Sequence, residues 1–277
     1  MGYCQTLKTR FFQAILFSNV LIGLLAFFQI LGHGKSGFPL FYCICTALGS
    51  FTLYNAQRLI KNRNIPIHAM SNRHLWIHQH KKTLLLFVLV TLVSTLVLLP
   101  FALQEVVWKW WMLIPVLCGL LYTGIPGSNF HGLREIPGLK SFLVAMVWTM
   151  LTFYIPYHQQ HSEKINLWIV SHQFFFFWVI AIWFDWRDRK YDAPNLFTIP
   201  QMAGTKGTII LSLLAWVAIL YAAFAIEEHY LFTDIGLLIS FFGIVLILIK
   251  KRNSEFALGF GMDGIIVLQG LILFFLK

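Results

Sequence analysis

The amino-acid sequence predicts an all-α polytopic membrane protein, a helical bundle of about nine transmembrane helices. Of its 277 residues, 58% are hydrophobic and only 12% are charged, and the mean hydropathy is +0.72. A soluble chain of this length buries one core and could not cover so many apolar runs. Crossing the hydrocarbon as a helix takes roughly 20 apolar residues, and such runs recur here with short polar breaks. We therefore expect one membrane-embedded domain over residues 1–277.

Nine apolar runs are long enough to be spans. The expected spans are residues 11–31, 37–60, 83–101, 106–124, 139–156, 166–184, 207–226, 231–249 and 256–276. The first run is longer than the hydrophobic part of a typical signal peptide and is followed by no obvious cleavage site. We interpret it as a retained helix.

Lysine and arginine are unevenly divided between the alternate loops. With the N-terminus inside, 17 of the 21 fall on the inner side, and the outer side keeps only Lys35, Lys109, Lys164 and Lys277. Positive loops stay in the cytoplasm, so this division predicts a multi-pass protein with its N-terminus cytoplasmic and its C-terminus outside, expected in a bacterial inner membrane. It also explains the net charge of +10 without a nucleic-acid partner.

A cluster of acids ends the sixth expected span. Asp185, Asp188 and Asp192 are three of only 11 carboxylates in the chain. Their spacing of i, i+3 and i+7 predicts one shared helical face, on which they repel one another unless a cation neutralises them. Mg²⁺ suits such oxygen ligands, because it takes one or two carboxylates and fills its shell with water and phosphate. The alternative is a solvated helix end whose acids pair with the basic residues Arg187, Arg189 and Lys190.

Two stretches of the sequence carry a resemblance to a known family. The motif Asp185-x-x-Asp188-x-x-x-Asp192, with Thr198-Ile199-Pro200 and Gly204 after it, resembles the second aspartate-rich motif of the UbiA superfamily of intramembrane prenyltransferases. The loop before the fifth span, with Leu121-Tyr122-Thr123, Arg134 and Pro137-Gly138-Leu139-Lys140, is similar to that family's loop between helices 4 and 5. Nine helices and a closing helix that begins near Asp263-Gly264 agree with the same family.

The resemblance implies a transferase. Its donor would be an isoprenyl diphosphate in the bilayer-embedded bundle, and its acceptor a lipophilic molecule. Asp185, Asp188 and Asp192 would be the catalytic residues and would hold Mg²⁺ against the diphosphate, whose departure leaves an allylic cation for the acceptor. Tyr122 and Arg134 would contact the substrate.

The sequence departs from this family at the first aspartate-rich motif, NDxxDxxxD. Only Asn55 is kept, because Ala56, Leu59 and Arg63 stand where aspartates are expected. No acid precedes Glu105, so none nearby can replace them. We therefore expect one Mg²⁺ site rather than two.

Three functions stay open on these residues. In the first, Arg58, Lys61 or Arg63 contacts the diphosphate directly and supplies the missing positive charge, with Asn55 beside the substrate. In the second, the chain keeps the fold as a non-catalytic lipid-binding or assembly protein, and these basic residues only anchor it at the membrane surface. The third is a transporter, which broken helices in paired halves would favour.

Other polar residues in the spans have two interpretations each. Asp263 lies at membrane depth and is a functional candidate or the partner of a basic residue. Asn55 and Tyr122 could line the same cavity or form helix–helix hydrogen bonds. Neighbouring histidines at 74, 78 and 80 could suggest a metal, but we interpret this stretch as an interfacial amphipathic helix anchored by Trp76.

Overall fold

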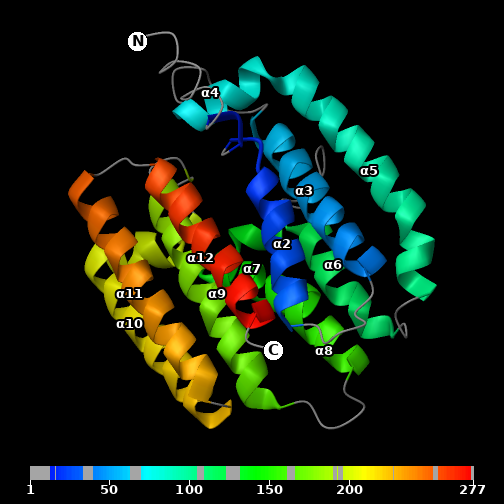
Figure 1. The fold of residues 1–277 in the computed structure, drawn as a ribbon. Coiled ribbons are helices and arrows are strands. Elements are labelled where there is room, and N and C mark those ends of the chain that lie inside the picture. The colour runs from blue at the N-terminus through cyan, green and yellow to red at the C-terminus, as the bar shows by residue number, and fades with distance from the viewer. Residues whose placement is uncertain are drawn as a thin grey trace, which may run out of the picture. The chain divides into compact units, whose positions relative to one another are not determined.

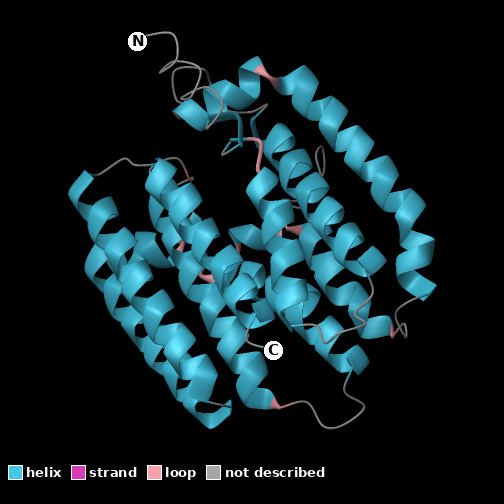
Figure 2. Cartoon of the chain, in the orientation of Figure 1, coloured by secondary structure: helices cyan, strands magenta, loops and turns pink. Residues whose placement is uncertain are grey.

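The computed structural model describes residues 13–15, 17–33, 40–62, 70–104, 109–122, 132–160, 166–189, 192, 196–226, 228–251 and 255–275. These residues form 11 α-helices and contain no strand (Figures 1 and 2). The predicted all-α class is confirmed for this part of the chain. The chain divides into two compact units, residues 1–27 with 39–106 and residues 28–38 with 107–277. The single domain expected from the sequence stays a prediction.

The first unit is built from α3 (Leu40–Asn62), α4 (Asn72–Gln79) and α5 (Lys81–Gln104). Helices α3 and α5 lie side by side, and the Thr52 hydroxyl donates to the Thr91 hydroxyl across them at 2.7 Å. Ser71 caps α4, because its hydroxyl oxygen accepts the backbone N–H of His74 at 3.3 Å. Most of the apolar side chains of α5 are exposed, as expected of a helix that faces lipid.

The first expected span is interrupted. Residues 13–15 and 17 are helical, Ser18 and Asn19 form a turn, and α2 (Val20–His33) begins directly after it. Asn19 has a positive φ of 59°, a left-handed conformation that asparagine tolerates better than most residues. The sequence predicted a continuous helix here because its apolar run continues through both polar residues.

The second unit contains the remaining helices and the last turns of α2. Their bounds are α6 (Leu113–Leu121), α7 (Leu139–Thr149), α8 (Ile155–Gln160), α9 (Leu167–Asp188), α10 (Ile199–Ile226), α11 (Glu228–Lys251) and α12 (Glu255–Phe275). A π-helical turn, η4 (Met150–Tyr154), joins α7 to α8, and two 3₁₀ turns, η2 (Trp110–Met112) and η3 (Leu133–Glu135), precede α6 and α7. Helix α9 packs against α7, α10 and α12, and α11 lies beside α10 and α12 (Figure 1).

Every expected span corresponds to helical residues, but the helices differ in length and apolarity. Five are long and apolar enough to cross a membrane: Lys81–Gln104, Leu139–His158, Leu167–Asp188, Ile199–Ile226 and Tyr230–Lys250. Val20–His33, Trp110–Leu121 and Phe260–Phe275 are shorter apolar helices within the described residues. The five long helices indicate a multi-pass integral membrane protein. Nine crossings and their orientation stay predictions.

Candidate functional site

The acidic cluster lies where α9 ends. Asp185 and Asp188 belong to the last turn of the helix, and Asp192 follows it, with its backbone N–H donating to the Asp188 carbonyl at 2.9 Å. The side chains of Asp185 and Asp192 are 7% and 0% exposed, whereas that of Asp188 is 22% exposed. The three acids therefore do not form one solvated face, because two of them point into the protein and the third stays nearer the surface.

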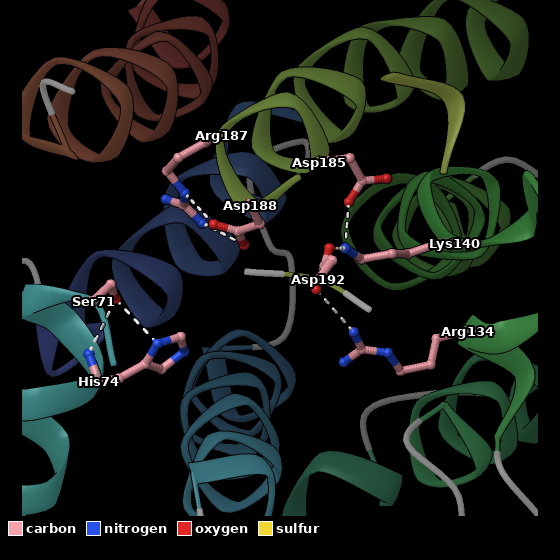
Figure 3. A network of polar contacts seen from close by, with 8 residues as sticks. All are labelled: Ser71, His74, Arg134, Lys140, Asp185, Arg187, Asp188 and Asp192. Carbon is pink, nitrogen blue, oxygen red and sulfur yellow. Dashed lines mark hydrogen bonds and ion pairs between the residues drawn. The ribbon is translucent and has the colours of Figure 1, made fainter. Parts of the chain in front are cut away.

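Lys140 joins the two buried acids. Its ammonium nitrogen lies 2.8 Å from Oδ1 of Asp185 and 2.5 Å from Oδ2 of Asp192 (Figure 3). Lys140 is the second residue of α7 and is itself buried. Lys140 belongs to the predicted family-like loop, but its pairing with the acids could not be predicted from the sequence, because 45 residues of chain separate Lys140 from Asp185.

A backbone hydrogen bond ties the start of α7 to the segment before α10. Gly138 adopts a φ of +71°, a conformation that favours glycine, and its N–H donates to the Phe197 carbonyl at 3.1 Å. Phe197 has a positive φ of 45°. Thr198 donates its backbone N–H to the Gln201 side-chain oxygen at 2.9 Å, so the segment before α10 is also held. Lys140 is thus positioned by the fold and is not a freely moving surface lysine.

Arg134 completes the buried charge cluster. Its guanidinium donates to Oδ1 of Asp192 at 3.3 Å and lies over the Tyr122 ring, 5.8 Å from the ring centre. The backbone N–H of Arg134 donates to the Tyr122 carbonyl at 3.1 Å. The structure therefore brings both predicted substrate-binding residues of this loop, Arg134 and Tyr122, next to the acids.

Asp188 has a different partner. Both of its oxygens accept from Arg187, at 2.7 Å from Nε and 3.0 Å from a terminal nitrogen (Figure 3). Arg189 instead donates to the Thr205 hydroxyl at 2.9 Å and lies over the Trp186 ring at 4.4 Å. The solvated-helix-end alternative thus describes the Asp188–Arg187 pair only; Lys190 lies outside the described residues.

The cluster fits poorly as a Mg²⁺ site held by three aspartates. Two acids and two cations give Asp185, Asp192, Lys140 and Arg134 a net charge of zero, and Asp188 is neutralised by Arg187. Oδ2 of Asp185 is the one buried carboxylate oxygen of the described cluster without a hydrogen-bond partner. Within the described ranges, no group of three or more Asp, Glu, His or Cys side chains is arranged to hold a metal ion.

Asn55 lies in the first unit and is completely buried. Its amide nitrogen donates to the carbonyls of Ser18 and Phe51, both at 3.0 Å, and its oxygen accepts from Asn19 at 2.8 Å. The hydrogen-bond interpretation of this residue is confirmed, and its place beside a substrate cavity stays a prediction. Asn55 satisfies a carbonyl freed by the interruption before α2 and holds the interrupting Asn19 in place.

The basic residues that follow Asn55 are only partly described. Arg58 and Lys61 lie on the last turns of α3 and are half-buried, and each interacts with its surroundings. Arg63 lies outside the described residues. Contact of any of them with a diphosphate stays a prediction.

The expected interfacial helix exists as α4. His74 is buried and its ring nitrogen Nδ1 lies 3.0 Å from the Ser71 hydroxyl (Figure 3). His78 is exposed, and His80 stacks on Trp76 with ring centres 4.4 Å apart. These three histidines therefore face different surroundings, which agrees with the helix rather than the metal interpretation. The position of α4 at a membrane surface stays a prediction.

Sequence reasoning missed a buried ring of three glutamines in the second unit. Gln29 of α2 donates to Gln269 of α12 at 3.2 Å, Gln269 donates to Gln173 of α9 at 3.3 Å, and Gln173 donates to Gln29 at 3.0 Å. All three are at most 1% exposed. Gln29 and Gln269 are isolated polar residues in apolar runs, and Gln173 lies beside Ser171 and His172 in another. A polar residue in an apolar segment is the only signal that the sequence offered.

His33 and the backbone complete the glutamine ring, defined as Gln29, Gln173 and Gln269. Nδ1 of His33 donates to the Gln29 carbonyl at 2.8 Å, since a carbonyl can only accept. Nε2 of His33 therefore accepts the second N–H of Gln173 at 2.8 Å, and the second N–H of Gln29 goes to the Ile266 carbonyl. Gln29 and Gln173 each use both side-chain N–H groups in these hydrogen bonds. The glutamine ring therefore has little hydrogen-bonding capacity left for a ligand.

A second missed pair is His172 with Asp234. Nε2 of His172 lies 2.6 Å from the Asp234 carboxylate, and both side chains are 1% exposed. Neither residue was a predicted candidate. Asp263, which was one, lies in α12, is half-buried and interacts with its surroundings.

Comparison with known proteins adds no relative. No family model, no curated protein and no solved structure matches this chain.

Proposed function

We propose that this chain binds an isoprenyl diphosphate and transfers its isoprenyl group to a lipophilic acceptor. The observation that carries the proposal is the charge cluster of Lys140, Arg134, Asp185 and Asp192, buried at the end of a long apolar helix. A diphosphate attached to a hydrocarbon chain needs this combination, because cations must meet its head while an apolar bundle accepts its tail. The resemblance of both loops to the UbiA superfamily supports the same activity.

Arg134 is the residue best placed to receive the diphosphate. Its contact with Asp192, at 3.3 Å, is longer than those of Lys140, and its side chain is 13% exposed, against 10% for Lys140. Replacing the Arg134–Asp192 hydrogen bond by one to a phosphate oxygen therefore destabilises the cluster less than breaking a Lys140 contact would. A guanidinium also binds phosphate through two parallel hydrogen bonds, which fixes the orientation of the head group.

Lys140 and Arg134 would assist the bond-breaking step. The bond between C1 of the isoprenyl chain and the bridging oxygen breaks, and its electron pair leaves with the diphosphate. The acceptor forms a new bond to C1 and releases a proton. Fixed cations beside the departing oxygens stabilise charge that develops in the transition state, which is the usual source of large rate effects in a water-poor site.

Purified protein in nanodiscs tests the proposal. It is incubated with isoprenyl diphosphates of increasing chain length and a membrane lipid extract as the source of acceptor, in Mg²⁺ and in EDTA, and released diphosphate is measured. We expect release with at least one donor. Arg134→Gln should weaken binding of that donor at least about tenfold, the loss expected for a hydrogen bond between charged groups. The control Lys82→Gln removes an exposed charge and should change nothing. Absence of release with every donor under both conditions would refute transfer.

A non-catalytic lipid-binding protein is the second candidate. It is favoured by the closed hydrogen bonding of Asn55 and by the internal pairing of all three aspartates. Binding of a non-reactive isoprenyl thiolodiphosphate, together with no turnover of any diphosphate, would select this function over transfer.

A further inference from the structure

The aspartate cluster already contains a cation. The Lys140 ammonium lies between the carboxylates of Asp185 and Asp192, at 2.8 Å and 2.5 Å, in the place that a bridging metal ion would need (Figure 3). We infer that Lys140 is the permanent counter-ion of this cluster and that the chain binds its diphosphate without a divalent metal. The statement about diphosphate rests on the proposed function, whereas the statement about the metal does not.

A divalent ion would have to displace this lysine. Lys140 is buried, so a displaced ammonium would have no water to move into and would lie close to the ion that replaced it. Two positive charges a few ångströms apart repel strongly in a buried site, and an unpaired buried charge carries a further desolvation cost. The backbone contacts of Gly138 with Phe197 hold the start of α7 and oppose its withdrawal.

The ligand set is also too small. Mg²⁺ requires near-octahedral oxygen ligands at about 2.0–2.1 Å and binds through carboxylates that are free to turn toward it. Asp192 uses one oxygen on Lys140 and the other on Arg134, and Asp188 uses both on Arg187. Only Oδ2 of Asp185 is left without a partner among the described atoms of the cluster.

The composition of the first half of the chain agrees with this inference. No Asp or Glu precedes Glu105, so no second set of acids exists there to share a metal with Asp185. Positive charge for a diphosphate must then come from side chains, and Arg134 already lies beside the cluster with a guanidinium that offers five N–H donors.

Manganese binding provides the direct test. The purified full chain is freed of metal with EDTA, titrated with Mn²⁺, and the free ion is counted by electron paramagnetic resonance. The wild type and Asp185→Asn should bind the same amount, because Asp185 is engaged by Lys140. Lys140→Met should gain a Mn²⁺ site and a melting temperature that rises by about 5 °C or more with saturating Mg²⁺. Lys82→Met, an exposed lysine, is the matched control and should gain neither.

A Mn²⁺ site in the wild type that Asp185→Asn removes would overturn the inference. So would a folded Lys140→Met that gains no site. If Lys140→Met does not fold, the comparison of wild type with Asp185→Asn decides alone.

Binding of an isoprenyl thiolodiphosphate separates the two claims. Its affinity should agree within about twofold in EDTA and in Mg²⁺, a difference of less than half a kcal/mol. Binding that requires Mg²⁺ would overturn the metal-free inference and leave the proposed function standing. No binding under either condition would refute the proposed function, while the Mn²⁺ comparison would still decide the role of Lys140.

Discussion

Replacement of Gln173 by leucine should destabilise the second unit measurably. Gln173 donates to Gln29 and His33 and accepts from Gln269, at distances of 3.0, 2.8 and 3.3 Å. Leucine fills a similar volume but removes all three hydrogen bonds. Hydrogen bonds between membrane helices contribute about 0.6 kcal/mol on average and at most about 1.7 kcal/mol each. Three of them give a loss of about 2–5 kcal/mol, from which the better burial of leucine subtracts.

The stability losses of the three single variants should also not add up in the triple variant. Gln173→Leu leaves two amides and one imidazole buried without their partners, and such orphaned groups cost more than the bonds themselves contribute. Addition of Gln29→Leu and Gln269→Leu removes the orphaned amides. The triple variant should therefore be more stable than the sum of three single losses predicts.

Denaturation in mixed micelles measures these values. The protein is titrated with SDS, and unfolding is followed by far-UV circular dichroism for the wild type, the single variant and the triple variant. Gln104→Leu, at the exposed end of α5, is the control and should stay within about 0.5 kcal/mol. A Gln173→Leu protein within about 0.5 kcal/mol of the wild type would show that the glutamine ring contributes nothing to stability.

Two further predictions concern the same unit. A Cβ on Gly270 would lie 2.5 Å from the Phe28 carbonyl oxygen, so Gly270→Ala must push α2 and α12 apart and should cost about 1–3 kcal/mol in the same titration. Gly236→Ala, where no heavy atom lies within 4 Å of the added Cβ, should leave stability unchanged or raised, and an equal loss in both variants would contradict the packing argument. His172→Phe leaves the buried Asp234 side chain without its 2.6 Å partner and should lower stability by about 1–3 kcal/mol, seen as a lower melting temperature. Adding Asp234→Leu should restore most of this loss; a double variant no better than the single one would show that the pair is not a coupled unit.

The helices and the position of the acids could be predicted from the sequence. A run of apolar residues long enough to cross a membrane is a local property, and α5 and α9 begin and end within a few residues of the predicted spans. The cluster at the end of α9 was visible because acids are scarce in this chain. The interruption at Asn19 was not visible, because one left-handed residue does not change the apolar pattern around it.

The partners of the polar residues were decided only by the tertiary structure. Lys140 lies at the start of α7, where the local sequence gave no sign of Asp185, and the pairing exists because α7 packs along α9 with one particular register. The three glutamines come from α2, α9 and α12, and nothing in the sequence of one helix shows that the other two glutamines lie beside it. Hydrophobicity along the chain determines that a segment becomes an apolar helix. Which buried charge meets which depends on helix order, rotation and depth, and these depend on contacts between residues far apart in the sequence.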